Sequence, residues 1–344
     1  MRRAAGSIAA EVNCFLNMLR DSDPLERDKR GVLVLDVTLH IGAHRTGTTS
    51  LQQLLGANAA ALNSANAAYW GPNRTRSGLF SGFFKDPTML TRDSLRRAKR
   101  STGVIQINLQ RLEAAGMGQL IVSEENMMGG ICDNLVATSL YPFAADRLSS
   151  FRRAFAGRRL QIALTIRSYE AYWASALAFS IKRGFAAPET AHLDLLVTQP
   201  RRWQSVIEAI VDVFPEAEVS VMTFEGFAGY ADRHLDLLLA RPLRVDLRQK
   251  HHWHNASPSR DKLRKILADR GDDAAGIKEG GGKWQPFDPH HIKTLREQYA
   301  RDLKWLASDA PAAVTFYPHA PGAMREGERT KGRERHDRIE RCVG

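Results

Sequence analysis

The chain has 344 residues, of which 43% are hydrophobic and 25% charged, and this ordinary composition excludes a wholly disordered chain, a collagen-like repeat and a bundle of membrane helices. The formal net charge is +11, but no helix-turn-helix, RNP, KH or zinc-finger signature accompanies it, so we expect no nucleic-acid partner. No apolar run reaches the roughly 18 residues of a transmembrane helix, and three widely spaced cysteines fit neither a disulfide framework nor a zinc module, so we expect a cytoplasmic protein.

Strand-like and helix-like segments alternate along the chain. After an N-terminal extension over residues 1–30, a run of β-branched and apolar residues at 31–41 predicts a buried strand, and residues 49–62 show helical periodicity. Further strands are predicted at 119–122, 160–166 and 219–224, and further helices at 168–183, 230–240 and 290–307. This alternation predicts one α/β domain at residues 31–310, with a doubly wound parallel sheet that binds ligands at the carboxyl ends of its strands.

Two stretches depart from this alternation. Residues 69–101 are rich in Gly, Pro, Ser, Arg and Phe with weak periodicity, so we expect an insertion or lid over the sheet. Residues 321–344 are highly charged and lack aromatic residues, which predicts a disordered tail. The excess positive charge lies inside the domain, with nine basic and two acidic residues at 74–111 and six against one at 145–167. This concentration predicts a face that attracts anions.

A glycine-containing turn directly follows the first predicted strand. It reads Gly42-Ala-His-Arg-Thr-Gly-Thr-Thr49 and leads into the first predicted helix. Two glycines five residues apart let backbone N–H groups converge on an anion, and the helix N-terminus adds a favourable partial charge. Thr48 occupies the position where a nucleoside triphosphatase places its lysine, and the cation is instead Arg45. The turn can therefore bind an anionic group but lacks the usual lysine for a triphosphate.

The segment His40-Ile-Gly-Ala-His-Arg-Thr-Gly-Thr-Thr-Ser-Leu51 resembles the 5′-phosphosulfate loop of sulfotransferases that use 3′-phosphoadenosine 5′-phosphosulfate, including bacterial ones. That family usually has Lys at the position of Arg45 and often Pro at that of His44, and arginine keeps the charge with a different geometry. The resemblance implies a P-loop-like fold and this nucleotide as sulfuryl donor. It assigns donor binding to Gly42, Arg45, Thr46, Gly47, Thr48, Thr49 and Ser50.

The family also has a site for the 3′-phosphate of the donor, made of an arginine at a strand end and a serine eight residues later. Here Arg167 follows the predicted strand at 160–166, and Ser175 stands eight residues further on within the next predicted helix. A guanidinium is suited to bidentate contact with phosphate, and the serine hydroxyl is a further donor. The resemblance therefore implies that these two residues bind the 3′-phosphate.

Sulfuryl transfer needs a base that accepts the proton of the attacking group. The segment Leu120-Ile-Val-Ser-Glu-Glu-Asn126 puts two carboxylates at the end of a predicted strand, and alternation lets one of Glu124 and Glu125 face the pocket. Similarity to the Ser-x-Glu-Asn segments of bacterial and carbohydrate sulfotransferases favours Glu125 as the base. His44 and His252 are the reserve candidates, and the histidines at 251–254 lack the spacing of a metal site.

The resemblance implies direct in-line transfer of a sulfuryl group, without a required metal, to a hydroxyl or amine of a carbohydrate, a lipid or a small molecule. Two other functions are compatible with the residues. One is a P-loop kinase or another user of nucleoside triphosphates, with Glu124 or Glu125 aiding Mg²⁺. The other is a non-catalytic module that binds anions. The sequence indicates neither the acceptor nor the oligomeric state.

Overall fold

The computed structural model describes residues 34–240, 247 and 257–320 of the chain. The expected N-terminal extension at 1–30, the expected tail at 321–344 and His252 lie outside these residues. None of the helices in the described part is both long and apolar enough to cross a membrane. The cytoplasmic location stays a prediction.

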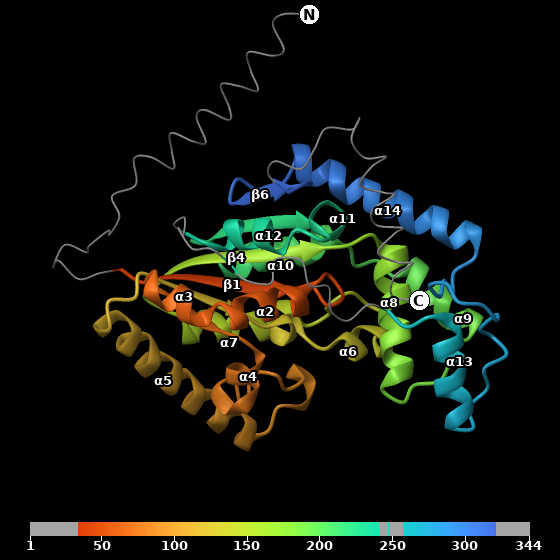
Figure 1. The fold of residues 1–344 in the computed structure, drawn as a ribbon, viewed down its shortest axis with the longest axis horizontal. Coiled ribbons are helices and arrows are strands. Elements are labelled where there is room, and N and C mark those ends of the chain that lie inside the picture. The colour runs from red at the N-terminus through yellow and green to blue at the C-terminus, as the bar shows by residue number, and fades with distance from the viewer. Residues whose placement is uncertain (1–33, 241–246, 248–256, 321–344) are drawn as a thin grey trace, which may run out of the picture.

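A six-stranded parallel sheet forms the centre of the molecule, with the strand order β2-β3-β1-β4-β5-β6 (Figure 1). The strands are β1 (Asp36–Gly42), β2 (Ala67–Trp70), β3 (Gln119–Ser123), β4 (Arg159–Ile166), β5 (Glu218–Thr223) and β6 (Val314–Tyr317). The sheet is flanked by helices, which confirms the doubly wound α/β architecture. The four predicted strands are present, whereas the two edge strands, β2 and β6, were not predicted because each has only four residues.

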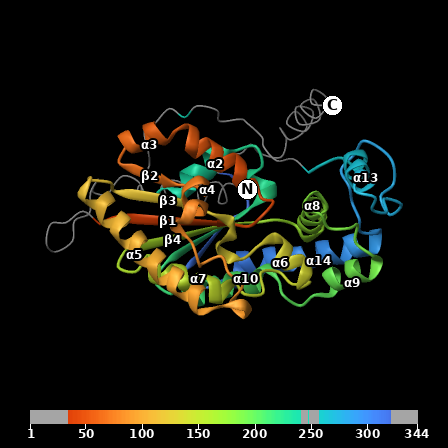
Figure 2. The same cartoon turned by 90° about the horizontal axis from the view of Figure 1, so that it is seen from below.

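Both faces of the sheet are covered. Every residue of β1 is buried, as expected for a central parallel strand that is covered on both sides. Neighbouring residues of β3 alternate between two apolar clusters: Ile121 belongs to one, and Leu120 and Val122 belong to the other. Helices α2, α3 and α12 cover the first face and helices α5, α7 and α10 the second, while α8, α9 and α13 lie beyond the carboxyl ends of the strands (Figures 1 and 2).

Helices are present at all four predicted places, with small shifts in their bounds. Their bounds are α2 (Thr48–Ala57), α3 (Ala59–Ser64), α4 (Pro72–Arg74), η1 (Thr75–Leu79), η2 (Pro87–Met89), α5 (Arg92–Ala114), η3 (Glu125–Met128), α6 (Ile131–Val136), α7 (Ala144–Ala154), α8 (Tyr169–Lys182), α9 (Thr190–Thr198), α10 (Trp203–Val213), α11 (Phe224–Phe227), α12 (Ala231–Leu238), α13 (Arg260–Asp269) and α14 (Pro289–Ser308). The predicted helix at 49–62 is two helices, because Asn58 ends the first one and its side-chain amide donates to the carbonyl of Leu54 at 2.8 Å.

Residues 69–101 hold more regular structure than their weak periodicity indicated. They include the end of β2, three short helical turns and the first part of α5. Helix α5 starts with a capping box in which Thr91 Oγ1 accepts from the Ser94 amide at 3.2 Å and Ser94 Oγ accepts from the Thr91 amide at 2.8 Å. The helix was missed because basic and apolar side chains share its exposed face, which weakens the periodic signal.

The order of the strands reverses at β1. The chain passes from β1 outward to β2, returns to β3 beside β1, and then crosses to β4 on the other side of β1. Ligands of open α/β sheets bind outside the carboxyl ends of the strands at such a reversal. The glycine turn that follows β1 therefore lies where this architecture places a binding site.

Candidate functional site

The turn after β1 is held in shape by its own residues. Gly42 has a φ of 97°, and a Cβ atom there would come 3.0 Å from the Cβ of Glu125, so a side chain at this position would push against the start of η3. The hydroxyls of Thr46 and Thr48 both donate to the carbonyl of Ala43, at 2.6 and 3.2 Å. Gly47, with a φ of 83°, leads into α2. The result is a tight loop at a helix N-terminus, where backbone N–H groups favour an anion.

The two motifs with which the sequence predicted anion binding contact each other. Arg45 Nε donates to Ser175 Oγ at 2.8 Å, and Arg167 Nη1 donates to the carbonyl of Arg45 at 2.8 Å. These pairs are 130 and 122 residues apart in the chain. Ser257, which the sequence did not indicate, joins them, because its hydroxyl lies 3.3 Å from Arg45 Nη2 and 2.8 Å from Ser175 Oγ. Arg45, Arg167, Ser175 and Ser257 thus form one connected group beside the loop.

The environment of Arg167 favours an additional negative charge. The pKa of Arg167 is lowered to about 10, mainly by burial and also by Arg45, while Glu225 acts in the opposite direction. The guanidinium lies over the ring of Phe224, 4.5 Å from its centroid, and Nε is buried without a hydrogen-bond partner in the part of the chain that the structure describes. Burial also lowers the pKa of Arg45. A bound phosphate would stabilise both cations and give Arg167 Nε an acceptor.

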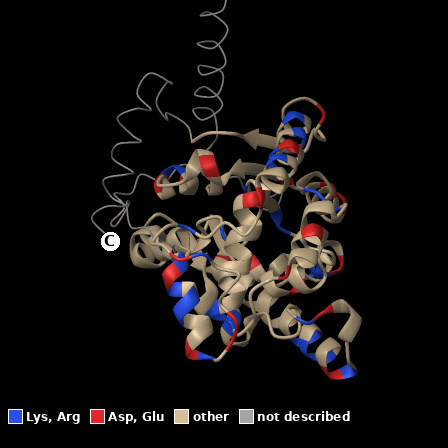
Figure 3. Cartoon of the chain, turned by 90° about the vertical axis from the view of Figure 1, so that its right-hand side faces the viewer, with Lys and Arg blue, Asp and Glu red and all other residues tan. Residues whose placement is uncertain are grey.

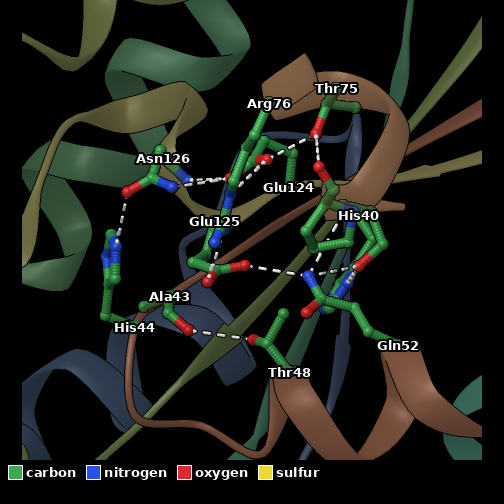
Figure 4. A network of polar contacts seen from close by, with 12 residues as sticks. His40, Ala43, His44, Thr48, Gln52, Thr75, Arg76, Glu124, Glu125 and Asn126 are labelled. Atoms are coloured by element: carbon green, nitrogen blue, oxygen red, sulfur yellow. Dashed lines mark hydrogen bonds and ion pairs between the residues drawn. The ribbon is translucent and has the colours of Figure 1, made fainter. Parts of the chain in front are cut away.

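Glu124 is completely buried and is fully engaged by neighbouring donors. Thr75 Oγ1 donates to it at 2.6 Å, Arg76 donates through Nε at 2.9 Å and Nη2 at 2.7 Å, and Asn126 Nδ2 donates at 2.7 Å (Figure 4). A buried carboxylate is tolerated when a cation and hydrogen bonds compensate for lost hydration. Glu124 therefore anchors Arg76 and Asn126 and has no free lone pair directed at a ligand.

Glu125 is the carboxylate that lies beside the glycine loop. Its Oε2 accepts from Gln52 Nε2 and its Oε1 accepts from Arg76 Nη2, both at 2.8 Å (Figure 4). Burial acts to raise the pKa of this carboxyl, but the groups around it, the Arg76 guanidinium among them, outweigh burial and lower the pKa below its ordinary value. Glu125 is thus ionised at neutral pH and can accept a proton from a group bound at the loop.

The hydrogen bonds of His44 define its protonation. The side-chain amide of Asn126 donates through Nδ2 to the carboxylate of Glu124, which can only accept. The Oδ1 atom of Asn126 therefore lies on the other side, 3.2 Å from His44 Nε2, and because Oδ1 can only accept, His44 Nε2 donates to it. His44 Nδ1 lies 2.9 Å from the hydroxyl of Tyr141 and therefore accepts from it. Burial lowers the pKa of His44, in keeping with a neutral ring. The one ring nitrogen with a lone pair already accepts from Tyr141, whereas each carboxylate oxygen of Glu125 has a second lone pair, so the geometry favours Glu125 over His44 as a base.

A second histidine lies under the loop, within β1. His40 is fully buried, and its Nδ1 is 2.8 Å from Ser123 Oγ. Its Nε2 has no hydrogen-bond partner in the described residues, and its ring meets the edge of the His234 ring at a centroid distance of 5.2 Å. Burial lowers the pKa of His40 to about 4 and that of His234 well below its ordinary value. Both rings are neutral parts of the core at pH 7.

The structure gathers most of the expected site residues around one loop. The loop itself contains Gly42, His44, Arg45, Thr46, Gly47 and Thr48, and Thr49 and Ser50 follow in the first turn of α2. Beside the loop lie Glu125, Arg167 and Ser175. Sequence analysis missed four residues that complete the network, namely Gln52, Arg76, Asn126 and Ser257. The sequence could have indicated Gln52, because it stands one helical turn after Thr48 and therefore lies on the same face of α2 as the loop residue Thr48.

Comparison with known proteins adds no assignment to this geometry. Neither the protein-family models nor the curated proteins that were searched include a match to the chain. Within residues 34–240, 247 and 257–320, no group of three or more His, Cys, Asp and Glu side chains is arranged to hold a metal ion. The function is therefore inferred from the loop, the two guanidiniums and the carboxylate themselves.

Proposed function

We propose that the protein is a sulfotransferase that moves a sulfuryl group from 3′-phosphoadenosine 5′-phosphosulfate to a hydroxyl or amine. The observation that carries this proposal is the contact of Arg45 with Ser175 and Arg167, which unites two anion-binding motifs at the end of one sheet. A donor with phosphate groups at both its 5′ and 3′ positions needs two such motifs within reach of one nucleotide. Arg45 and the N-terminus of α2 would bind the phosphosulfate, and Arg167 with Ser175 the 3′-phosphate.

The proposed reaction is a single in-line displacement at sulfur. The acceptor oxygen or nitrogen forms a bond to sulfur, the bond between sulfur and the bridging phosphate oxygen breaks, and its electron pair stays on the leaving adenosine 3′,5′-bisphosphate. Glu125 takes the acceptor's proton, and Arg45 stabilises the charge that develops on the leaving phosphate.

A kinase or another user of nucleoside triphosphates is less compatible with this geometry. Thr48, at the position of the usual lysine, is buried and donates its hydroxyl to the loop carbonyl of Ala43. Glu124, one of the two carboxylates considered for aiding Mg²⁺, is engaged by Arg76, Thr75 and Asn126. The arrangement thus favours a donor that requires positive side chains more than a metal.

The ligand preference tests this proposal directly. In thermal unfolding, adenosine 3′,5′-bisphosphate at about 100 times its Kd should stabilise the protein by about 2.7 kcal/mol, whereas ATP with Mg²⁺ should stabilise it much less. Equal stabilisation by the two ligands, or a preference for ATP, would contradict the sulfotransferase proposal. Adenosine 5′-monophosphate, which lacks the 3′-phosphate, is the matched control.

Turnover separates an enzyme from a module that only binds anions. The protein should release adenosine 3′,5′-bisphosphate from the sulfuryl donor when a suitable acceptor from a panel of carbohydrates, lipids and small hydroxyl or amine compounds is present. Binding of the bisphosphate without turnover on any acceptor class would favour the non-catalytic module.

A further inference from the structure

Helix α5 and the short segment before it expose an unusual share of the large apolar side chains of the described residues. The inner face of α5 is buried through Ser94, Ser101, Ile105 and Leu109, and Gln106 connects the helix to α7 by donating to the carbonyl of Ala154 at 2.7 Å. Nine large hydrophobic side chains are exposed in the described residues, and five of them lie between positions 89 and 107. Those five are Met89, Leu90, Leu95, Val104 and Ile107, with exposed fractions from 39 to 72%.

The same surface is strongly basic. Residues 92–100 contain five Lys and Arg, all exposed, and a single acidic residue, Asp93, which pairs with Arg96. We call the five apolar residues named above, together with Arg92, Arg96, Arg97, Lys99 and Arg100, the α5 outer face. Helix α13 differs, because it has an acidic residue near each end, Asp261 and Asp269, and on the side of the molecule seen in Figure 3 the two kinds of charge lie close together.

We propose that the α5 outer face docks the protein on an anionic lipid surface. Exposed cations are attracted to acidic headgroups, and apolar side chains placed among them can enter the boundary between headgroups and acyl chains. A dissolved polyanion would use the cations but would leave Leu95, Val104 and Ile107 in water, so the mixture of both side-chain types favours a membrane surface. With 23 residues and a rise of about 1.5 Å per residue, α5 presents roughly 34 Å of helix to such a surface.

Docking of this kind is peripheral and reversible. The buried side of α5 stays packed on the domain through Ile105 and Leu109, so the helix contributes one face and does not insert across the bilayer. The interaction is electrostatic at long range and apolar at contact, which predicts binding that weakens with salt but does not vanish. This docking does not depend on the reaction proposed above, because the α5 outer face includes no residue of the candidate site.

Co-sedimentation of the full chain with vesicles tests the proposal. The protein should bind vesicles of phosphatidylcholine with phosphatidylserine, and should bind vesicles of phosphatidylcholine alone far more weakly. The triple variant Arg92→Gln, Lys99→Gln, Arg100→Gln should lower the partition coefficient about a hundred-fold. The control variant Lys262→Gln, Lys265→Gln, Lys278→Gln removes the same charge from exposed positions on and near α13 and should change it little. Equal losses in both variants would overturn the assignment to α5.

The apolar residues provide the second test. The variant Leu95→Gln, Ile107→Gln keeps every charge and should weaken vesicle binding several-fold at both low and high salt. If this variant binds vesicles like the unaltered protein, or if heparin binds tightly while phosphatidylserine vesicles do not, the partner is a soluble polyanion and the proposal is wrong. All positions changed are exposed, and unaltered thermal unfolding of each variant would show that the fold is retained.

Discussion

The candidate site has a carboxylate half, around Glu124 and Glu125, and an arginine half, around Arg45 and Arg167, and the two differ in how their charges are neutralised. Around Glu124 and Glu125, the guanidinium of Arg76 bridges both carboxylates, at 2.7 and 2.8 Å, and the negative charges have a cation within the protein. Around Arg45 and Arg167, burial lowers the pKa of each guanidinium, and Arg167 Nε has no acceptor in the described residues. Carboxylates that share a cation of the protein position neighbouring groups, whereas a buried guanidinium with an unsatisfied N–H is suited to a ligand that brings an acceptor.

The carboxylates offer the largest test of this contrast. Glu125→Gln should lower turnover about a thousand-fold, because a neutral amide cannot take the acceptor's proton, and should lower the temperature of unfolding less than a change at the fully buried Glu124 does. Glu124→Gln should instead lower the temperature of unfolding, because Arg76 loses a charged partner inside the protein. Comparing kcat with thermal unfolding for the pair separates the roles, and an active Glu125→Gln enzyme would exclude Glu125 as the base.

Arg45 should show the next largest effect. Arg45→Ala removes the cation of the loop and should lower kcat about a hundred-fold, since a donor to a developing oxyanion is worth about that much. Arg45→Lys, which restores the residue usual in the resembling family, should recover most of the activity. If the alanine variant keeps its turnover, the leaving phosphate is stabilised elsewhere.

Arg167 sharpens the distinction between the two phosphate positions. Arg167→Ala should weaken the binding of adenosine 3′,5′-bisphosphate about 30-fold, as expected for a lost hydrogen bond to a charged group. The affinity for adenosine 5′-monophosphate should change much less. Calorimetric titration of both ligands measures the difference, and Arg183→Ala, an exposed arginine on the same side of the sheet, is the control. Similar losses for both nucleotides would remove the assignment of Arg167 to the 3′-phosphate.

The smallest expected effect is an acid sensitivity of the fold beneath the loop. Because the pKa of His40 is lowered to about 4 in the folded state, the unfolded chain binds a proton first as the pH falls below about 6.5. Stability is therefore lost between pH 6.5 and pH 4, by about 2 kcal/mol from this residue between pH 7 and pH 5. His234 contributes in the same direction. Denaturant unfolding at several pH values checks this, and His40→Asn should flatten the pH profile.

The proximity of Arg45 to Arg167 and Ser175 was predictable from the sequence, and the contacts of the two carboxylates were predictable only in part. Arg45 and Arg167 each follow a strongly apolar strand, and the ends of parallel strands meet at one edge of the sheet, so linear order translates into proximity. The pairing of Arg76 with Glu124 could not be predicted in this way, because Arg76 does not follow a strand of the sheet. Arg76 stands in the irregular segment at 75–79, and only the folded path of that segment brings it to β3.

The fold was predictable where apolar runs were long. Central strands are marked by continuous β-branched and apolar residues, whereas β2 and β6 have four residues each and lie at the edges, where part of the strand is exposed. The choice between Glu124 and Glu125 also needed coordinates. The alternation of side chains along a strand predicts that Glu124 and Glu125 point to opposite sides, but not which of them faces the glycine loop. The position of Glu125 next to Gly42 and its hydrogen bond from Gln52 show that Glu125 is the one beside the loop.

The strand order has a consequence for the spacing of the reacting groups. Glu125, Arg45 and Arg167 follow β3, β1 and β4, which are immediate neighbours in the sheet. Adjacent strands are held about 4.8 Å apart by their backbone hydrogen bonds, so the sheet fixes the spacing between the points from which the Glu125 carboxylate and the two guanidiniums project. Replacing a side chain can retune the strength of any one group, but shifting the groups relative to each other would require rebuilding the turns after these three strands.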